Sequence, residues 1–275
     1  MKNEIFDLVG KEIGSHTAGK APITSTLLLR EDLGLSSMKM VMVLTATCQK
    51  LDISILDFAD YELMRLKTVS DLTELLYEKR TMRIKERLFD PLQILESDRI
   101  SLRHIQKSDF EQLKAIAYDP SIWKHFTVEI LSDQELQRYI DDAVHDFEKK
   151  QRVTFLIFDK VRDCAVGMSS LGNISVVDRR IEIGWSWLGS DFQGVGINQE
   201  YKNLLLGFVF DELGFLRVEF KTDILNTKAR KALMKIGGVE EGVLRSHTLM
   251  PHGRRRNTIY YSILQDEWAL RNELA

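Results

Sequence analysis

A run of alternating residues followed by a glycine-containing string is the most chemically suggestive feature of the chain. Residues 181–188 read Ile-Glu-Ile-Gly-Trp-Ser-Trp-Leu, and residues 193–198 read Gln-Gly-Val-Gly-Ile-Asn. A strand that ends in a glycine loop and continues as a helix directs several backbone N–H groups at one point, where the positive end of the helix dipole also lies. Glycine lets an anion approach the backbone closely. This order indicates a seat for a diphosphate, although a plain tight turn is the commoner meaning of Gly-x-Gly.

A serine near the N-terminus is the second candidate. It belongs to the string Asp-Leu-Gly-Leu-Ser-Ser-Met over residues 32–38. A serine at the start of a helix exposes its hydroxyl at the positive end of the dipole, which suits a residue that bears a phosphodiester. The alternative is a simple N-cap, because a serine hydroxyl accepts hydrogen bonds from free N–H groups in the first turn. These residues alone leave both interpretations of Ser37 open.

The elements that position this serine are predicted to be helices. Apolar residues recur at helical spacing in three segments of residues 2–80. They are Ile5, Leu8, Val9 and Ile13 in the first segment, Met38, Val41, Leu44, Thr45 and Cys48 in the second, and Val69, Leu72, Leu75 and Leu76 in the last. Ser37 and Ser70 are predicted to start the later two helices. Residues 51–60 are predicted to form a loop with one short helical turn.

This segment resembles the acyl/peptidyl carrier protein family over residues 2–80, on its length, its helices and the Asp-Leu-Gly-x-x-Ser string that ends at Ser37. The resemblance implies an all-α four-helix carrier bundle over residues 1–80. It also implies that a phosphopantetheinyl transferase attaches 4′-phosphopantetheine to Ser37. Ser36 stands where many carriers have aspartate, and Lys39 lies early in a helix that is usually acidic. Both departures bear on the partner enzymes, because charge complementarity governs such encounters.

Residues 81–97 are predicted to connect two modules. They are charged, include Pro91 and retain some apolar residues. They do not form a Gly/Ser tether, so the expected connector is short and partly ordered. The 275 residues of the chain are enough for two domains.

The remaining residues, 98–275, show a mixed order of strands and helices. Strands are predicted at residues 100–102, 153–158, 165–170, 181–188, 217–222, 242–249 and 258–264. Helices are predicted at residues 109–117, 199–213 and 227–236, and Gly237 and Gly238 end the last of them. This order predicts an α/β (α+β) domain with a mixed, mostly antiparallel sheet and one βαβ crossover.

In this position the glycine string resembles the GNAT superfamily of acyltransferases, over about residues 98–269 and closest to the ribosomal-protein-type N-acetyltransferase branch. The family signature is Gln/Arg-x-x-Gly-x-Gly/Ala, and Asn198 departs from its last position. The resemblance implies the GNAT fold, with acetyl-CoA or another acyl-CoA as co-substrate and an amine as acceptor. The residues implied to hold the cofactor diphosphate are Gln193, Gly194, Val195, Gly196, Ile197 and Asn198.

The resemblance also implies roles near the thioester. The strand before the loop is expected to part from its neighbour, and a backbone N–H near Leu188 to polarise the thioester carbonyl and stabilise the oxyanion. Asn226 matches the family's asparagine near the thioester and the pantetheine arm. Arg230, one turn along the same helix face, is expected to approach the cofactor phosphate.

Glu182 is the expected proton acceptor. An alkyl amine, with a reference pKa of about 10.4 for lysine, must lose a proton before it attacks a thioester. Glu182 lies on the strand before the loop, where the family often keeps a glutamate that works through water, and a carboxylate suits this task. The alternative is a strand-edge glutamate paired with Arg179 or Arg180. The general acid is left unassigned because the helix after residue 226 lacks the family's tyrosine, and Tyr260 and Tyr261 are the available substitutes.

Composition argues against several classes of protein. A net charge of -3 does not suggest a nucleic-acid binder. No apolar run approaches the roughly 20 residues of a membrane span, and the first residues lack a signal peptide pattern. Cys48 and Cys164 provide neither a disulfide framework nor a metal cluster. His247 and His252 lack a third ligand at suitable spacing, so no metal site is expected. A reducing cytoplasm fits this cysteine usage.

Three further groups carry weaker signals. Residues 254–256 are three consecutive arginines, predicted to be a solvated loop with an anion site as the alternative. Trp185 and Trp187 alternate on the predicted strand, which favours a shared face as core or cleft wall. His247 is interpreted as a structural histidine, with the acceptor site as the alternative.

The expected function is transfer of an acetyl or other acyl group from a pantetheine thioester to an amine, in a chain that also carries an acyl carrier domain. The arm on Ser37 either donates the acyl group or presents a tethered amine. Acetyl-CoA and a free amine are the conventional alternative, in which the carrier serves another enzyme. The rival hypothesis is a non-catalytic docking module for a carrier that serves other biosynthetic enzymes.

Overall fold

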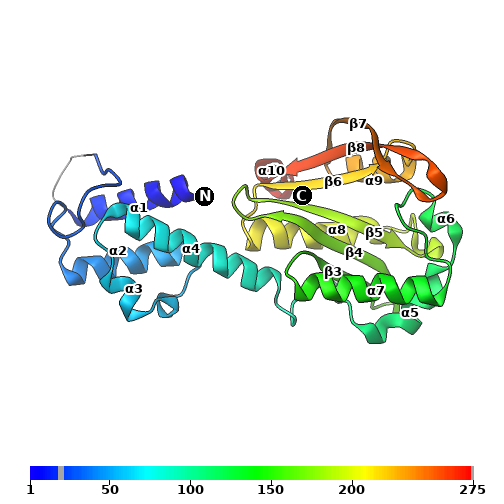
Figure 1. The fold of residues 1–275 in the computed structure, drawn as a ribbon, viewed down its shortest axis with the longest axis horizontal. Coiled ribbons are helices and arrows are strands. Elements are labelled where there is room, and N and C mark those ends of the chain that lie inside the picture. The colour runs from blue at the N-terminus through cyan, green and yellow to red at the C-terminus, as the bar shows by residue number, and fades with distance from the viewer. Residues whose placement is uncertain (18–21, 274–275) are drawn as a thin grey trace. The chain divides into compact units, whose positions relative to one another are not determined.

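The computed structural model describes residues 1–17 and 22–273 (Figure 1). The chain divides into two compact units, Met1–Arg87 and Leu88–Ala275. Each unit has its own buried apolar core. None of the helices in the described part of the chain combines the length and the apolar character that a membrane span requires.

The first unit is built from helices. They are α1 (Lys2–His16), α2 (Ser37–Lys50), η1 (Ile55–Asp57), α3 (Asp60–Met64) and α4 (Val69–Leu88). Apolar side chains from α1, α2 and α4 meet in one core, to which the loops add Leu29 and Leu35. The helical content therefore agrees with the sequence pattern. A carrier function for this unit remains a prediction.

Several local details of the first unit differ from expectation. Ser36, not Ser37, caps α2 by accepting a hydrogen bond from the Lys39 N–H at 3.3 Å. Thr68 caps α4, where its Oγ1 accepts from the Asp71 N–H at 3.1 Å, so Ser70 already lies inside that helix. Helix caps shifted by one or two residues are a common error of sequence patterns, because Ser and Thr can both cap a helix at neighbouring positions.

The buried face of α2 was also predicted only in part. Leu44 and Cys48 are buried as expected, whereas Met38 and Val41 are 72% and 52% exposed. Val43 and Thr47 are buried in their place. The helix is apolar on more than one side, so periodicity alone did not choose the face that meets α1.

The segment predicted as a connector, residues 81–97, is more regular than its charge content suggested. Residues 81–88 continue α4, and residues 94–96 form the first strand of the second unit. The charged residues that suggested a loop occupy the exposed side of α4, while Ile84 and Leu88 are buried. Charge content therefore masked a helical repeat.

The second unit contains one eight-stranded sheet with the order β1-β2-β3-β4-β5-β6-β8-β7. Its strands are β1 (Ile94–Glu96), β2 (Ile100–His104), β3 (Val153–Asp159), β4 (Cys164–Ser175), β5 (Arg180–Leu188), β6 (Arg217–Asp223), β7 (Val239–Leu249) and β8 (Arg255–Leu264). Of these strands, only β5 and β6 pair in parallel. The helix α8 (Ile197–Gly207) lies between them in sequence and provides the crossover connection. This confirms the expected mixed, mostly antiparallel sheet.

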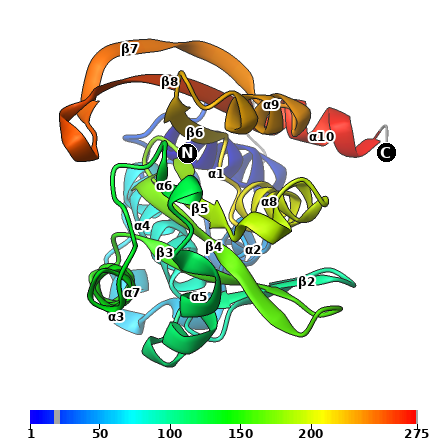
Figure 2. The same ribbon diagram turned by 90° about the vertical axis from the view of Figure 1, so that its right-hand side faces the viewer.

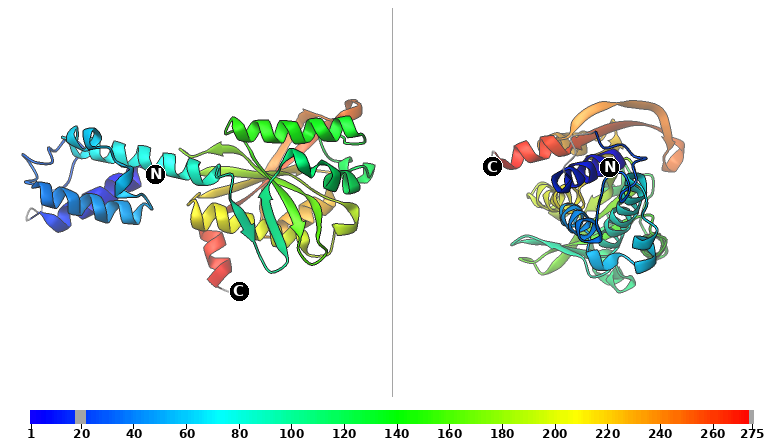
Figure 3. Two further views of the ribbon diagram at one scale, coloured as in Figure 1. Left: turned by 90° about the horizontal axis from the view of Figure 1, so that it is seen from below. Right: turned by 90° about the vertical axis from the view of Figure 1, so that its left-hand side faces the viewer.

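Helices cover both faces of this sheet (Figures 2 and 3). They are α5 (Phe110–Ala117), α6 (Pro120–Trp123), α7 (Asp133–Glu148), α8 (Ile197–Gly207), η4 (Phe208–Glu212), α9 (Thr227–Lys235) and α10 (Gln265–Glu273), with short turns η2 (Lys107–Asp109), η3 (Ser190–Phe192) and η5 (Pro251–Gly253). Helices α5 and α7 pack on one face with a core that includes Trp123 and Trp187. Helix α8 lies on the opposite face.

Candidate active site

A wedge opens between β5 and β6. The two parallel strands pair only at three positions, from Arg180 opposite Arg217 to Glu182 opposite Glu219. Beyond that point β5 stays paired with β4, and β6 stays paired with β8. The facing edges of the two strands therefore separate in the middle of the sheet and leave backbone N–H and C=O groups without a strand partner. We call this gap the wedge.

A bulge in β5 explains the separation. Trp185 has a φ of 51°, and the register between β4 and β5 shifts next to it. A bulge bends its strand and increases the local twist, so the second half of β5 turns away from β6. The two tryptophans differ in surroundings: Trp187 is 3% exposed in the core, whereas Trp185 is 37% exposed and stacks with Arg152. The shared environment predicted for them is wrong because the bulge breaks the strand alternation.

Leu188 directs its N–H into the wedge. The next N–H, of Gly189, donates to the Val166 carbonyl on the β4 side at 3.0 Å. Successive N–H groups of an extended strand point to opposite edges, so that of Leu188 faces the separated edge. Its carbonyl accepts from Gln193 Nε2 at 3.1 Å. Gln193 thus fastens the loop to the end of β5 rather than pointing a free side chain at a ligand.

The glycine loop leads from this point into α8. Gly194 and Gly196 have φ of 80° and 90°, a region that favours glycine, and nothing lies within 4 Å of a Cβ built at either residue. The first N–H groups of α8 have no partner within their own helix. Ile197 is fully buried and anchors the helix start. Open space beside the two glycines, backbone donors at the helix start and the helix dipole are features that suit an anion.

Two contacts hold this loop that the sequence pattern did not reveal. Arg99 donates from Nη1 to the Val195 carbonyl at 3.2 Å, and from Nη2 to the buried Asp159 at 3.0 Å. The Asn198 Oδ1 accepts from the Tyr201 hydroxyl at 3.0 Å. These partners lie 96 and 3 residues away in sequence, so only the second was within reach of a local motif.

Glu182 is buried at the mouth of the wedge, 5% exposed. Its Oε2 accepts from Asn173 Nδ2 at 2.5 Å and from Lys221 Nζ at 2.6 Å. Burial lowers the pKa of Lys221, but hydrogen bonding and attraction to Glu182 outweigh it and raise this pKa above its usual value. Arg180, one of the partners expected from sequence, contacts Asp178 instead. Lys221 lies on β6, far from Glu182 in sequence, so the residues near position 182 could not predict this ion pair.

Asn226 and Arg230 are placed on α9 as predicted. Asn226 caps the helix, with its Oδ1 accepting from the Ala229 N–H at 3.0 Å. Arg230 donates to the Tyr261 hydroxyl at 3.1 Å and lies 3.4 Å from Glu240. Both side chains therefore have structural partners in addition to the cofactor roles implied for them.

The end of β6 carries a polar cluster that sequence reasoning missed. Asp223 is fully buried and forms an ion pair with Arg254. His125, which follows α6, has its Nδ1 3.6 Å from the Asp223 carboxylate. Burial lowers the pKa of His125, and the attraction of Asp223 only partly offsets this. The arginine run at 254–256 was the one sequence signal for this cluster.

Ser37 belongs to the first unit, whereas the other predicted site residues belong to the second. It is the first residue of α2 and is exposed. Gly34, with a φ of 60°, turns the chain into the helix start. Because Ser36 supplies the cap, the Ser37 hydroxyl is not needed for that purpose.

Lys202 is a buried cation beneath the sheet. It is 7% exposed on α8, and its ammonium lies 5.3 Å from the centre of the Phe220 ring. No carboxylate among residues 1–17 and 22–273 is within ion-pair distance of it. Burial lowers the pKa of Lys202 to about 8.

We expect Lys202→Met to raise the free energy of unfolding at pH 7 by about 2 kcal/mol, because it removes a desolvated charge and keeps the apolar stem. The folded pKa of about 8 lies below the usual 10.5. Between these values the unfolded chain binds more protons, so wild-type stability rises with pH across this window. The advantage of the variant should therefore shrink from pH 8 to 10.5 in denaturant unfolding. A constant advantage would contradict this assignment.

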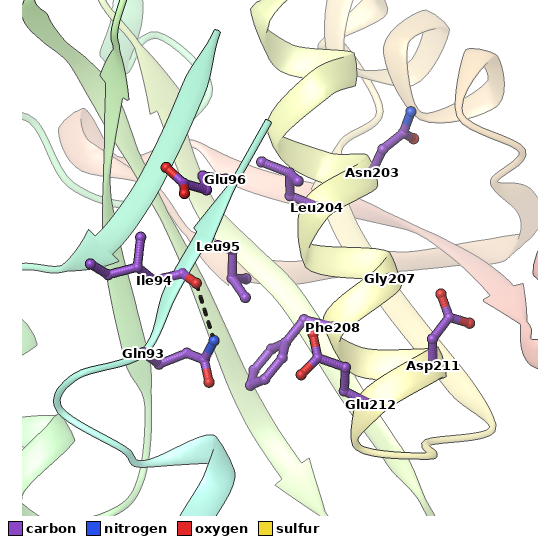
Figure 4. A pocket seen from close by; sticks show the side chains of 10 residues that line it. All are labelled: Gln93, Ile94, Leu95, Glu96, Asn203, Leu204, Gly207, Phe208, Asp211 and Glu212. Atoms are coloured by element: carbon purple, nitrogen blue, oxygen red, sulfur yellow. Dashed lines mark hydrogen bonds between the residues drawn. The ribbon is translucent and has the colours of Figure 1, made fainter. Parts of the chain in front are cut away.

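A surface hollow of about 450 Å³ lies elsewhere in the second unit, between β1 and α8 (Figure 4). Leu95 and Phe208 face its floor, and Glu96, Asp211 and Glu212 supply carboxylates at its edge. None of the predicted site residues lines it. Among the described residues, no three His, Cys, Asp or Glu side chains lie close enough together to hold a metal ion. His247 contacts the Thr258 hydroxyl at 3.0 Å, in keeping with the structural interpretation.

Comparisons with known proteins agree with this geometry. The family model described as acetyltransferase (GNAT) domain matches residues 99–239, just over half of the chain. The provisionally named ribosomal N-acetyltransferase YdaF of Bacillus subtilis (strain 168) is 37% identical over 102 residues, which cover 37% of this chain and 55% of YdaF. The chain thus spans about half the length of that relative.

Two further similarities cover the second unit more fully. An uncharacterised N-acetyltransferase, p20 of Bacillus licheniformis, is 27% identical over 65% of this chain and 99% of its own length. The crystal structure of a GCN5-related N-acetyltransferase from Brucella melitensis superposes with a TM-score of 0.60 at 24% identity, covering 64% of this chain and 80% of that one. The latter likeness supports the fold of the second unit.

Proposed function

Because this chain belongs to the acetyltransferase (GNAT) family and is an acyltransferase, we propose that it moves an acetyl group from a coenzyme A thioester to an amine. The observation that carries the proposal is the wedge, which opens directly onto the glycine loop at the start of α8. A pantetheine arm fits along the free edge of β5. The diphosphate then lies at the N–H groups around Gly196, with Gly194, Val195 and Asn198 beside it.

The proposed reaction is direct attack. The amine nitrogen forms a bond to the thioester carbonyl carbon, the C–S bond breaks, and coenzyme A leaves as a thiolate that takes up a proton. The N–H of Leu188 stabilises the negative charge that develops on the carbonyl oxygen. Asn226 and Arg230 assist in binding the arm and the phosphates. We propose Glu182, acting through water, as the group that takes the proton from the amine.

We expect Glu182→Gln to lower kcat about a hundredfold at saturating acetyl-CoA. This is the low end of the range for loss of a general base, because the ion pair with Lys221 already stabilises the negative charge of Glu182. The substitution keeps the size of the side chain and a contact for Asn173. Thiol release from acetyl-CoA, followed with an amine panel, measures the effect. The dissociation constant of coenzyme A should change less than threefold.

Glu219→Gln is the matched control for this variant. Glu219 lies directly opposite Glu182 where the strands are still paired, and its carboxylate contacts Arg217 at 2.9 Å. Its kcat should stay within twofold of wild type. If Glu182→Gln keeps more than a third of wild-type kcat, the carboxylate serves only to hold Lys221, and the proton leaves by another route.

We further propose that the first unit is a carrier domain with 4′-phosphopantetheine on Ser37, attached by a phosphopantetheinyl transferase. Its helices, its separate core and the exposed position of Ser37 support this. An arm on Ser37 has the same thioester chemistry as the free cofactor. Placing it in the same chain raises its effective concentration at the wedge without requiring tight binding.

Two outcomes separate the modes of action. If Ser37→Ala retains full acetyl transfer from acetyl-CoA to free amines, the arm is not the obligatory donor. If neither wild type nor variant releases thiol from acetyl-CoA with any amine, the second unit acts as a docking module for the carrier. We propose that the chain acts in the cytoplasm, where coenzyme A is available to both units.

A further inference from the structure

A charged face of the sheet continues beyond the wedge. Lys221 pairs with Tyr260 and Asp223 pairs with Thr258 across β6 and β8, and directly opposed residues share a face. Arg256, two residues before Thr258 on β8, lies on that same face. The carboxylates of Asp223 and Glu182 both attract its guanidinium. Arg256 therefore stands beside the proposed reaction site.

The charges at the end of this face next to Arg256 do not balance. Lys221 is paired with Glu182, and Arg254 is paired with Asp223. Arg256 is the third cation against these two carboxylates, which leaves one positive charge. His125 adds to this positive charge only when it is protonated, and burial lowers its pKa.

Arg256 has one internal partner of low strength. Its Nε donates to the Thr258 hydroxyl at 2.9 Å. Within residues 1–17 and 22–273 no carboxylate lies within ion-pair distance of its guanidinium, so its two terminal nitrogens have no anionic partner. Burial lowers the pKa of Arg256 despite the attraction of nearby carboxylates. The side chain is half-buried, a costly position for an unpaired charge.

The fork geometry of arginine selects the missing partner. A guanidinium presents parallel N–H groups that match the two oxygens of a carboxylate, and such bidentate contacts are among the strongest in proteins. A ligand that brings one negative charge balances the face. A single uncompensated positive charge favours one carboxylate over a phosphate dianion.

We propose that Arg256 binds the carboxylate of the acceptor, and that the acceptor is a free amino acid whose amine reaches the wedge beside Glu182. This rests on the proposed acetyl transfer and names its acceptor class. Arg256 acts here as a substrate-binding residue and takes no part in proton transfer. The carboxylate oxygens accept from its terminal nitrogens, while the amine nitrogen attacks the thioester carbonyl.

The test compares amino acids with the amines that lack only the carboxylate. Alanine and ethylamine, phenylalanine and phenethylamine, and histidine and histamine form three matched pairs. For wild type we expect kcat/KM to favour the amino acid of the pair that reacts best by tenfold to a hundredfold. Arg256→Met should abolish this preference, with a larger effect on KM for the amino acid than on kcat.

Arg255→Met is the matched control. Arg255 is the neighbouring residue on β8, is exposed, and donates from Nε to the Ser246 hydroxyl at 3.0 Å. Its side chain lies on the opposite face of the strand, so the preference should remain. Arg256→Lys keeps the charge without the fork and should retain a weakened preference. It also keeps the proposal testable if Arg256→Met fails to fold.

Three results would overturn the proposal: equal kcat/KM within the pairs, a preference for the bare amine, or a preference that survives in Arg256→Met. If no thiol is released with any amine, it is the proposed acetyl transfer that fails, and the carboxylate site is left untouched by that result. In that event calorimetry of the coenzyme A complex decides the carboxylate site. N-acetylphenylalanine should bind at least tenfold more tightly than N-acetylphenethylamine in wild type, and equally in Arg256→Met. Equal affinities in wild type would contradict the site.

Discussion

Gly196→Val should lower kcat/KM for acetyl-CoA at least a thousandfold. Gly196 has a φ of 90° directly before α8, a conformation in which a β-branched side chain is strained. The added methyl groups also point into the open space that we assign to the diphosphate. Each charged hydrogen bond lost from a phosphate oxygen costs about 1.5–3 kcal/mol, so two lost contacts are sufficient for the effect. Steady-state thiol release over a range of acetyl-CoA concentrations measures it.

Gly237→Val separates strain from function. Gly237 has a φ of 93° after the end of α9, and a Cβ there likewise meets nothing within 4 Å. Both variants should lose a similar free energy of unfolding, of order 1–3 kcal/mol. Only Gly196→Val should lose the response to acetyl-CoA. If Gly237→Val loses kcat/KM to the same extent, the effect is a general consequence of strain, and the loop assignment falls.

Ser37→Ala should abolish attachment of phosphopantetheine. Wild-type protein incubated with coenzyme A and a phosphopantetheinyl transferase should gain one phosphopantetheine group by intact mass, and the variant none. The result is expected to be all-or-none because the serine oxygen forms the phosphodiester bond. Ser37 is exposed at the first residue of α2, where the dipole favours the phosphate charge.

Ser36→Ala is the matched control one residue earlier. Ser36 caps α2, so this variant should lose about 1 kcal/mol of stability and still accept the full phosphopantetheine group. Loss of modification in Ser36→Ala with retention in Ser37→Ala would exchange the two roles. An unmodified wild type would remove the carrier proposal and leave the acetyl transfer proposal standing.

Features set by local sequence were predictable. Positive φ at residues 194 and 196 requires the glycine string. The strand before this string and the helix after it follow from residue spacing over a few positions. The helical segments of the first unit and the end of α9 at Gly237 are equally local. These signals located the loop, whereas Leu188 and Asn226 were assigned only through the resemblance to the GNAT superfamily.

Features set by tertiary contacts were not predictable. The bulge at Trp185 depends on the register between β4 and β5, which no residue near 185 announces. Glu182 takes its partner from β6, and Arg99 reaches Val195 across 96 residues. The short turn η2 and the terminal helix α10 were not predicted, because short polar helices depend on packing more than on pattern. Helix α7 was also not predicted, although its 16 residues bury Leu136, Ile140 and Ala143 at helical spacing, so its pattern was present in the sequence.

The most direct test of the account is calorimetric titration of coenzyme A into the full chain, made as Ser37→Ala so that no covalent arm competes. We expect one site per chain with micromolar affinity, lost in the additional Gly196→Val variant and retained with Gly237→Val. Absence of binding to Ser37→Ala, or binding that Gly196→Val leaves unchanged, would contradict a cofactor held at the wedge by the start of α8.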